Sequence, residues 1–256
     1  MDATRSDRFY DDLARWWPLF SPPYEYGDEA GQIRRVLEQR ATGPLRALLE
    51  LGSGGGHVAS HLSTRFELTL VDLSPGMLEV SRALNPGVEH HEGDMYDVRL
   101  GRTFDAVLVH DAVMYATTEE QLAAVVATVW AHCRPGGLAV LNPDWTRERF
   151  EPSTECGGDD ESAEGGGRRG LRYLMWIWDP DPTDTEVVAD FAFLLREADG
   201  STSAVHDRHH WGTFPETTWL DALATVGFEA VEVVDEVDGE APEGVMFVAR
   251  RPALSQ

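Results

Sequence analysis

The chain has 256 residues, of which 42% are hydrophobic, with only two cysteines and a formal net charge of -24. These values allow one large domain, or one domain with a lid, and they exclude a wholly disordered chain and a disulfide scaffold. No apolar run approaches the roughly 20 residues that span a bilayer. With 45 acidic residues against 21 arginines, the composition predicts no nucleic-acid partner and no membrane partner.

The first segment, residues 1–44, is predicted to form an N-terminal helical lid. Residues 28–39 carry an apolar stripe at helical spacing, which favours an amphipathic helix. Residues 16–27 are rich in proline and aromatic side chains and are interpreted as a rigid connector. The first 17 residues lack a basic region followed by an apolar stretch, so we expect no secretory signal and a cytoplasmic address.

From Leu45 onward, apolar runs typical of buried parallel strands alternate with helical stretches. The predicted strands are 45–51, 66–73, 88–94, 104–113 and 138–145, and the predicted helices are 56–64, 75–84 and 118–133. Within the last helix, Thr118 and Gln121 have the spacing of a capping box, and Pro135 and two glycines follow as a stop. This alternation predicts a doubly wound, Rossmann-like α/β sheet.

The alternation breaks after Trp145. Residues 153–170 are glycine-rich and acidic and are predicted to form a mobile loop. Three stretches with β character follow, at 171–178, 186–198 and 203–214, separated by strong turn signals. We therefore expect residues 153–212 to form a mobile loop and an inserted antiparallel β-meander.

The α/β pattern resumes at the end of the chain. A helix is expected to begin near Pro215. Residues 228–237 and 244–251 then form a terminal antiparallel strand pair, which completes a predicted seven-stranded sheet. The core accordingly spans 45–152 and 213–256.

A glycine-rich turn follows the first predicted strand. Gly52, Gly54 and Gly56 let the backbone turn tightly and approach a ligand closely. Glycine turns alone are weak signals, because they also mark ordinary tight turns. His57 stands where a dinucleotide fingerprint requires its third glycine, so that fingerprint fails, whereas an acidic-x-G-x-G-x-G motif that begins at Glu50 is complete.

Asp72 ends the second predicted strand, 20 residues after Gly52. A carboxylate at that place can accept hydrogen bonds from both hydroxyls of a ribose. The alternative is a strand-end turn residue or a cap of the next helix. The joint spacing of turn and acid favours ribose binding.

Together these motifs resemble the class I S-adenosylmethionine-dependent methyltransferases over residues 45–145. The stretch Asp72–Met77 resembles their second-strand motif, Gly93–Met95 their third, 104–115 their fourth strand, and Arg134–Gly137 the lead-in to the fifth. The resemblance implies that S-adenosylmethionine is the cofactor, that Asp72 holds its ribose and that Met77 and Asp94 lie near its adenine. The implied cofactor-binding set is Glu50, Gly52, Ser53, Gly54, Gly56, Asp72, Leu73, Met77, Asp94, Met95 and His110.

The chain also resembles, more narrowly, the bacterial N-methyltransferases of nucleotide-linked amino sugars. The shared features are the Tyr10–Asp11 motif, the stretch Asn142–Trp145 after the fifth strand, and the insert before a PETTW helix. The resemblance implies that Tyr10 borders the methyl donor and that the inserted sheet walls the substrate and helps to form a homodimer. The chain departs from these enzymes at Tyr115, where they tend to carry a histidine.

Methyl transfer mainly requires the acceptor to be held in line with the methyl group; an amine must be neutral, and a hydroxyl benefits from a base. We predict Tyr10, His110 and Tyr115 as the catalytic residues, with a cofactor-edge or packing contact as the favoured role of His110. Other candidate bases are Asp111, Asp144, His206, His209 and His210. The three strand histidines are interpreted as solvated, and we predict no metal site because no third ligand has recognisable spacing.

The predicted function is methylation of a small-molecule acceptor, either an amino sugar or another secondary metabolite. O-methylation of a hydroxyl or carboxylate, a non-catalytic cofactor-binding protein and an NAD-dependent oxidoreductase are the alternatives. Five arginines near the insert either bind an anionic acceptor or pair with neighbouring acids. They are Arg147, Arg149, Arg168, Arg169 and Arg172. The identity of the acceptor and the atom methylated stay open.

Overall fold

The computed structural model describes residues 8–162 and 166–254. Seven strands form the central sheet in the order β11-β12-β5-β4-β1-β2-β3. Their bounds are β1 Ala47–Leu51, β2 Glu67–Asp72, β3 Glu89–Glu92, β4 Phe104–Val109, β5 Cys133–Leu141, β11 Glu229–Val234 and β12 Met246–Arg250. Strands β1 to β5 are parallel, while β12 runs antiparallel to β5 and β11. The predicted seven-stranded, Rossmann-like sheet with its terminal antiparallel pair is confirmed.

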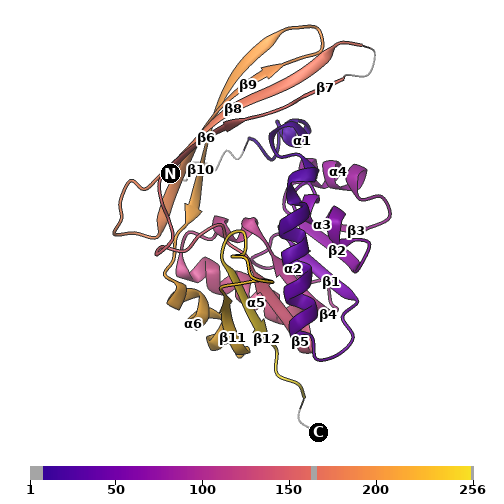
Figure 1. The fold of residues 1–256 in the computed structure, drawn as a ribbon, viewed down its shortest axis with the longest axis vertical. Helices are drawn as coiled ribbons and strands as arrows, with labels where there is room; N and C mark the ends of the chain where they lie inside the picture. The colour runs from indigo at the N-terminus through magenta and orange to yellow at the C-terminus, as the bar shows by residue number, and fades with distance from the viewer. Residues whose placement is uncertain (1–7, 163–165, 255–256) are drawn as a thin grey trace.

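Helices cover both faces of this sheet (Figure 1). Because successive strand side chains point to opposite faces, Leu48 joins the cluster under α2 (Gly27–Arg40) and α3 (His57–Leu62), whereas Leu49 joins the cluster under α5 and α6. Helix α5 spans Glu119–His132, α6 spans Glu216–Val226, and α4 (Pro75–Leu84) packs against α3 and β3. No helix in the described part of the chain is long and apolar enough to cross a membrane.

Two predicted boundaries on the central sheet are wrong. The fourth strand was expected over 104–113, but β4 ends at Val109 and Asp111–Tyr115 forms the 3-10 helix η3. The pairing of β4 with β5 ends at Val109, so the chain beyond it has no ladder to follow. The capping box at the start of α5 is present as predicted, but residues 133–137 begin β5 instead of a connecting turn.

The insert is a five-stranded antiparallel sheet with the order β10-β9-β8-β6, in which β7 also pairs with β8. Its strands are β6 Ser153–Gly157, β7 Asp160–Ser162, β8 Arg168–Trp178, β9 Glu186–Arg196 and β10 Thr202–Gly212. The predicted meander is confirmed, but the predicted mobile loop over 153–170 is wrong. Most of that segment is strand, because the long strand β8 offers backbone partners that composition does not reveal. Residues 163–165 lie outside the described residues.

The N-terminal segment runs beneath the insert (Figure 1). Instead of a plain connector, it forms three short helices, η1 (Ala14–Trp16), α1 (Trp17–Phe20) and η2 (Pro23–Tyr26). Phe9 and Trp16 are buried in a third apolar cluster together with Phe193 of the insert. The segment therefore joins the insert to the core at the carboxyl edge of the parallel strands; residues 1–7 of the predicted lid lie outside the described residues.

Candidate active site

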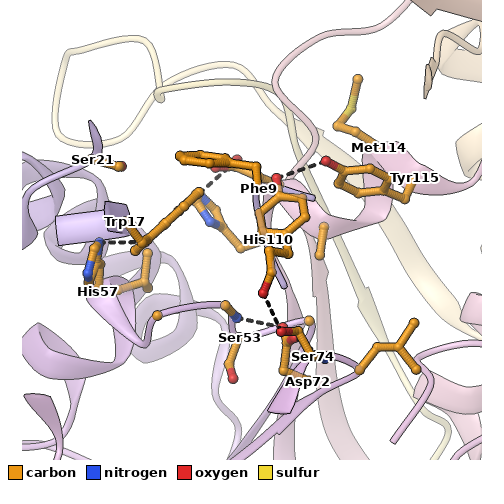
Figure 2. A pocket seen from close by; sticks show the side chains of 18 of the residues that line it. Phe9, Trp17, Ser21, Ser53, His57, Asp72, Ser74, His110, Met114 and Tyr115 are labelled. Atoms are coloured by element: carbon orange, nitrogen blue, oxygen red, sulfur yellow. Dashed lines mark hydrogen bonds and ion pairs between the residues drawn. The ribbon is translucent and has the colours of Figure 1, made fainter. Parts of the chain in front are cut away.

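A cavity of about 790 Å³ lies where the core, the N-terminal segment and the insert meet. Its volume is within the range of small-molecule sites. The core lines it from the carboxyl ends of β1, β2 and β4, where open α/β sheets bind ligands. In Figure 2, Ser53 and Asp72 lie on one side of the cavity, and Phe9 and Tyr115 lie across from them. Ligand recognition at this place draws on all three parts of the fold.

The glycine turn exposes backbone to this cavity. Gly52 has φ 69° and Gly54 has φ 53°, which is the left-handed region that favours glycine. A Cβ at Gly52 would lie 2.2 Å from the Cβ of Ala112, so this glycine is required by packing. A Cβ at Gly54 would meet only the Cε of Met77, at 3.5 Å, so Gly54 is open toward the cavity that it lines.

Asp72 serves the fold and faces the cavity at the same time. Its Oδ2 accepts a hydrogen bond of 2.7 Å from the Gly54 N–H, and its Oδ1 accepts one of 2.8 Å from the Ser74 N–H. Burial raises the pKa of this carboxyl, and these backbone hydrogen bonds oppose that rise. Two carboxylate oxygens carry about four lone-pair sites, so capacity for two ligand hydroxyls is left.

Four buried polar atoms on the cavity wall lack a hydrogen-bond partner within the described chain. They are the Oε2 of Glu50, the Oγ of Ser53, the Nε2 of His57 and the indole Nε1 of Trp211. Burial without a partner is costly, so these atoms suit a bound polar ligand. Together with the open Gly54 and Asp72, they fit a ligand with ribose hydroxyls and a charged polar end, as S-adenosylmethionine has.

A buried ion-pair cluster surrounds His110. Its Nε2 lies 2.7 Å from the Oε1 of Glu29 and 3.1 Å from the Oδ1 of Asp111. Burial by itself lowers the pKa of His110, but the carboxylates of Asp111, Glu29 and Glu50 outweigh it and raise this pKa to about 10. At neutral pH His110 is therefore already protonated and cannot act as a general base. Glu29, His110 and Asp111 lie close enough together to hold a metal ion, but here they pair with one another. The absence of a metal site remains a prediction from the sequence.

A second polar network joins the two predicted tyrosines to the insert. The Tyr115 hydroxyl donates to the Tyr10 hydroxyl at 2.8 Å and lies 2.6 Å from the Nδ1 of His209. The Nε2 of His209 lies 3.2 Å from the Oδ2 of Asp207, which also accepts a 2.9 Å hydrogen bond from the Phe9 N–H. The interpretation of His209 as solvated is therefore wrong, because only 1% of it is exposed.

The alternation of side chains along β10 explains why its histidines differ in burial. Asp207, His209 and Trp211 alternate along β10 and face inward. His206 and His210 lie on the opposite face, where they pair with Asp190 and Glu186. Strand geometry places alternate residues on opposite faces, but the sequence did not show which face is buried.

The other predicted cofactor residues divide into two groups. Leu73, Asp94 and Met95 line the cavity. Gly56 and Met77 do not line it: a Cβ at Gly56 would lie 2.2 Å from the Oγ of Ser81, and Met77 is fully buried beneath the turn. For these two residues, packing between α3 and α4 replaces the predicted ligand contact.

Several aromatic residues around the cavity were not in the predicted site. The Trp17 indole N–H donates to the Nδ1 of His57 at 3.2 Å, with both side chains on the cavity wall. Tyr26, Tyr173 and Phe191 add rings from the N-terminal segment and the insert. Only the density of aromatic residues in those segments hinted at this role, since their contacts join positions far apart in the chain.

The arginines near the insert pair with acids. Arg172 binds Asp160 at 3.0 Å, Arg169 binds Glu161, and Arg149 binds Glu216. Among the residues that the structure describes, no arginine lines the cavity. The pairing alternative therefore explains these three arginines.

Comparisons with known proteins agree with this architecture. Residues 48–137 match a methyltransferase domain family. The dTDP-3-amino-3,6-dideoxy-alpha-D-glucopyranose N,N-dimethyltransferase of Streptomyces fradiae is 32% identical over 79% of this chain and 77% of its own length. The dTDP-3-amino-3,4,6-trideoxy-alpha-D-glucopyranose N,N-dimethyltransferase of Streptomyces venezuelae is 38% identical, but the match spans only about half of each protein, 49% of this chain and 54% of that one.

Solved structures show the same likeness over nearly the full length. DesVI of Streptomyces venezuelae superposes with a TM-score of 0.79 at 27% identity and covers 94% of this chain and 99% of that one. CalS10, an amino pentose methyltransferase from Micromonospora echinaspora whose structure has S-adenosylmethionine bound, gives 0.70 at 30% identity over 88% and 91%.

Proposed function

Since this chain belongs to the class I S-adenosylmethionine-dependent methyltransferases, we propose that it methylates the amine of a nucleotide-linked amino sugar. The cofactor supplies a methyl group that its sulfonium already activates. The oxidoreductase alternative is thereby set aside. Two relatives named for dTDP-amino-sugar N,N-dimethylation support the choice of acceptor.

The observation that carries this proposal is the charge of the cavity. Eight acidic residues line it, and no arginine does within the described chain. The lining acids are Asp11, Glu25, Glu50, Asp72, Asp94, Asp111, Asp144 and Glu155. Glu50 adds no charge at pH 7, because burial raises its pKa to about 8, and burial also raises the pKa of Asp144, so the negative charge comes from the other acids. His110 is balanced by its own carboxylate partners, and burial lowers the pKa of His57 to about 4, so that His57 is neutral. Such a cavity favours a cationic amine over a carboxylate or phosphate group.

Residues of the core hold the cofactor in this proposal. Asp72 accepts hydrogen bonds from its ribose hydroxyls, and Asp94 receives the adenine amino group. Glu50 and Ser53 take its charged polar end, which gives their unpartnered oxygens a role. Gly54 leaves room for the close approach of the ligand to the backbone.

The N-terminal segment and the insert hold the acceptor. The Ser74 hydroxyl donates to the backbone oxygen of Tyr10 at 2.6 Å, which ties the segment to the turn after Asp72. Tyr10 and Tyr115 present hydroxyls on the cavity wall, and the aromatic rings exclude water. We propose that the chain works as three parts: the N-terminal lid of residues 1–44, the cofactor-binding core of 45–152 and 213–256, and the acceptor-binding insert of 153–212.

We further propose that two copies associate through the outer face of the insert. Leu174, Trp176 and Leu194 are exposed on neighbouring strands β8 and β9, and Trp176 stacks on Trp178 at 5.4 Å. We call these four side chains the outer patch. A contiguous exposed apolar patch of this kind is typical of an interface. The absence of nucleic-acid partners and the cytoplasmic address remain predictions from the sequence.

The test of the function compares two acceptors that differ at one atom. The protein is incubated with S-adenosylmethionine and either a dTDP-3-amino-3,6-dideoxyhexose or the matched sugar with a hydroxyl at that carbon. Mass spectrometry should detect one or two added methyl groups on the amine and none on the hydroxyl sugar. Methylation of the hydroxyl sugar at an equal rate would refute N-selectivity, and methylation of neither would refute the acceptor class.

A further inference from the structure

We propose that His209 accepts, through the Tyr115 hydroxyl, the proton that the acceptor's ammonium group must lose, and that Asp207 stabilises the resulting imidazolium. This inference rests on the proposed function, because it concerns an amine acceptor. His209 does not line the cavity; it acts from behind Tyr115, which does. His209 is thus a proton-accepting and positioning residue, and Tyr115 is the residue that meets the acceptor.

The geometry provides a continuous path from the cavity into the insert. The Tyr115 oxygen lies 2.6 Å from the Nδ1 of His209, and the Nε2 of His209 lies 3.2 Å from Asp207. Asp207 and His209 are 4% and 1% exposed, so solvent does not compete for their proton. The hydrogen bond from the Phe9 N–H fixes Asp207 from the N-terminal segment. This hydrogen bond ties the proton path to the N-terminal segment.

The titratable groups that face His209 come from three elements. Tyr115 contributes from η3, Tyr10 from the N-terminal segment with its ring 5.4 Å away, and Asp207 from the same strand. Strand β9 presents the ring of Phe191, 4.9 Å away. Among the described residues that face His209, Asp207 is the carboxylate within hydrogen-bond distance of it.

The proton balance is simple. An ammonium nitrogen has no lone pair; when its N–H bond breaks, the electron pair stays on nitrogen and the proton passes to the Tyr115 oxygen. The original O–H bond of Tyr115 breaks in the same step, and that proton forms an N–H bond with the Nδ1 of His209. The hydroxyl proton must first turn from Tyr10 toward Nδ1, which rotation about the C–O bond allows. His209, now an imidazolium, returns its proton to solvent by the same path when the cavity opens.

His110 cannot replace this path. Its raised pKa keeps it protonated, and its Nε2 is committed to Glu29 and Asp111. The structure places a histidine from the insert directly behind the hydroxyl of Tyr115. The base is thus supplied by the insert instead of by the core.

The test measures kcat from about pH 6 to about pH 9.5, a range chosen to include the pKa of an ordinary amine. The variants are His209→Gln, Tyr115→Phe and the double variant that carries both substitutions. General-base catalysis contributes about 10²- to 10⁴-fold, so kcat should fall by about 10²-fold at the low end. The deficit should shrink as pH rises, because bulk solvent then delivers the neutral amine. The double variant should lose no more than either single variant, because both break one path. His206→Gln is the matched control, a histidine–aspartate pair on the outer face of the same strand, and it should keep wild-type kcat at every pH.

Other outcomes would overturn the inference. A loss of kcat that stays constant with pH would indicate a structural role. Additive losses in the double variant would show that His209 and Tyr115 act independently. Undiminished kcat in either single variant would show that the proton does not take this path. Thermal melting identifies any misfolded variant. If His209→Gln is misfolded, Asp207→Asn replaces it, because the amide oxygen of asparagine can still accept the hydrogen bond from the Phe9 N–H. The kcat of Asp207→Asn must then approach the wild-type value as pH rises, as expected for His209→Gln. If the wild-type protein methylates no amine, it is the proposed function that fails.

Discussion

Asp72 shares its carboxylate between the protein backbone and the cavity, so its replacement has two separable effects. Asp105 is a matched control, since its Oδ2 also accepts two backbone N–H bonds, at 2.8 and 2.9 Å, but it pairs with Arg134 and does not line the cavity. We expect Asp72→Asn and Asp105→Asn both to lower the melting temperature.

Only Asp72→Asn should weaken cofactor binding. Losing hydrogen bonds to a charged group costs about 1.5–3 kcal/mol, or about 10- to 150-fold in affinity. Titration calorimetry with S-adenosylhomocysteine measures the change in both variants. Equal affinities in the two folded variants would show that Asp72 acts only as a turn residue.

The protonation of Glu50 predicts a pH-dependent affinity. Burial raises the pKa of this carboxyl to about 8, so below pH 8 the free protein holds Glu50 neutral. A positively charged ligand favours the ionised form, so binding must displace a proton and weakens by up to about tenfold per pH unit below that pKa. Affinity for S-adenosylmethionine should therefore rise from pH 6 to pH 8 and level off above it.

Calorimetry in two buffers of different ionisation enthalpy should detect the released proton at pH 7. Glu50→Gln has no proton to release, so its affinity should be flat over the same range. A flat profile in the wild-type protein would contradict the assignment of Glu50 to the charged end of the cofactor.

Sequence reasoning found the site residues that belong to a motif with a recognisable spacing along the chain. Asp72 and Gly54 belong to one local motif, and both line the cavity. His209 was named as a candidate base but interpreted as solvated, because its partners Tyr115 and Phe191 come from other elements. His110 was found, but its protonation depends on Glu29 in α2, which no local pattern connects to it.

At the level of elements, two glycines of the same turn have different roles, Gly52 in packing and Gly54 in access for the ligand. Gly52 and Gly54 both have positive φ, so alanine at either costs about 1–2 kcal/mol in backbone strain. Gly52→Ala adds a contact of 2.2 Å with Ala112, whereas Gly54→Ala points into open space. We expect Gly52→Ala to show the larger drop in melting temperature, and Gly54→Ala to fold but bind the cofactor about tenfold or more weakly. Wild-type affinity in Gly54→Ala would show that the turn faces away from the ligand.

The helices and parallel strands were predictable because buried apolar runs and capping residues are local signals. Helix α4 matches its predicted range, and α5 begins at its capping box. The segment 153–170 was not predictable, because its glycines and acids lack strand propensity and its strands exist only through pairing with β8. Tertiary hydrogen bonding overrode composition there.

For the whole molecule, the outer patch predicts a dimer. We expect the double variant Trp176→Arg, Leu194→Arg to sediment at half the mass of the wild-type protein, because charge on an apolar interface is costly to bury. Leu254→Arg is the control, since Leu254 is also exposed, at 80%, but lies outside the patch. A wild-type monomer, or a double variant that stays dimeric, would remove the proposed interface.

The sequence led us to expect a lid and an insert that walls the substrate, but the contacts that hold the three parts around the cavity could not be read from it. Alternating strands and helices predicted the core, and turn signals predicted the meander. Nothing local to Phe9 or Trp16 indicates that they pack under the insert. The cavity that follows from this contact, with its acidic lining, is a property of the assembled fold.

The most direct test of the account is a crystal structure of the protein with S-adenosylhomocysteine and a dTDP-amino sugar. We predict that the cofactor's ribose lies on Asp72, that the sugar nitrogen lies within hydrogen-bond distance of the Tyr115 hydroxyl, and that the diphosphate lies outside the acidic cavity. A diphosphate inside this cavity, or an amine bound away from Tyr115, would contradict the claim that the insert and the core together hold an amine for methylation.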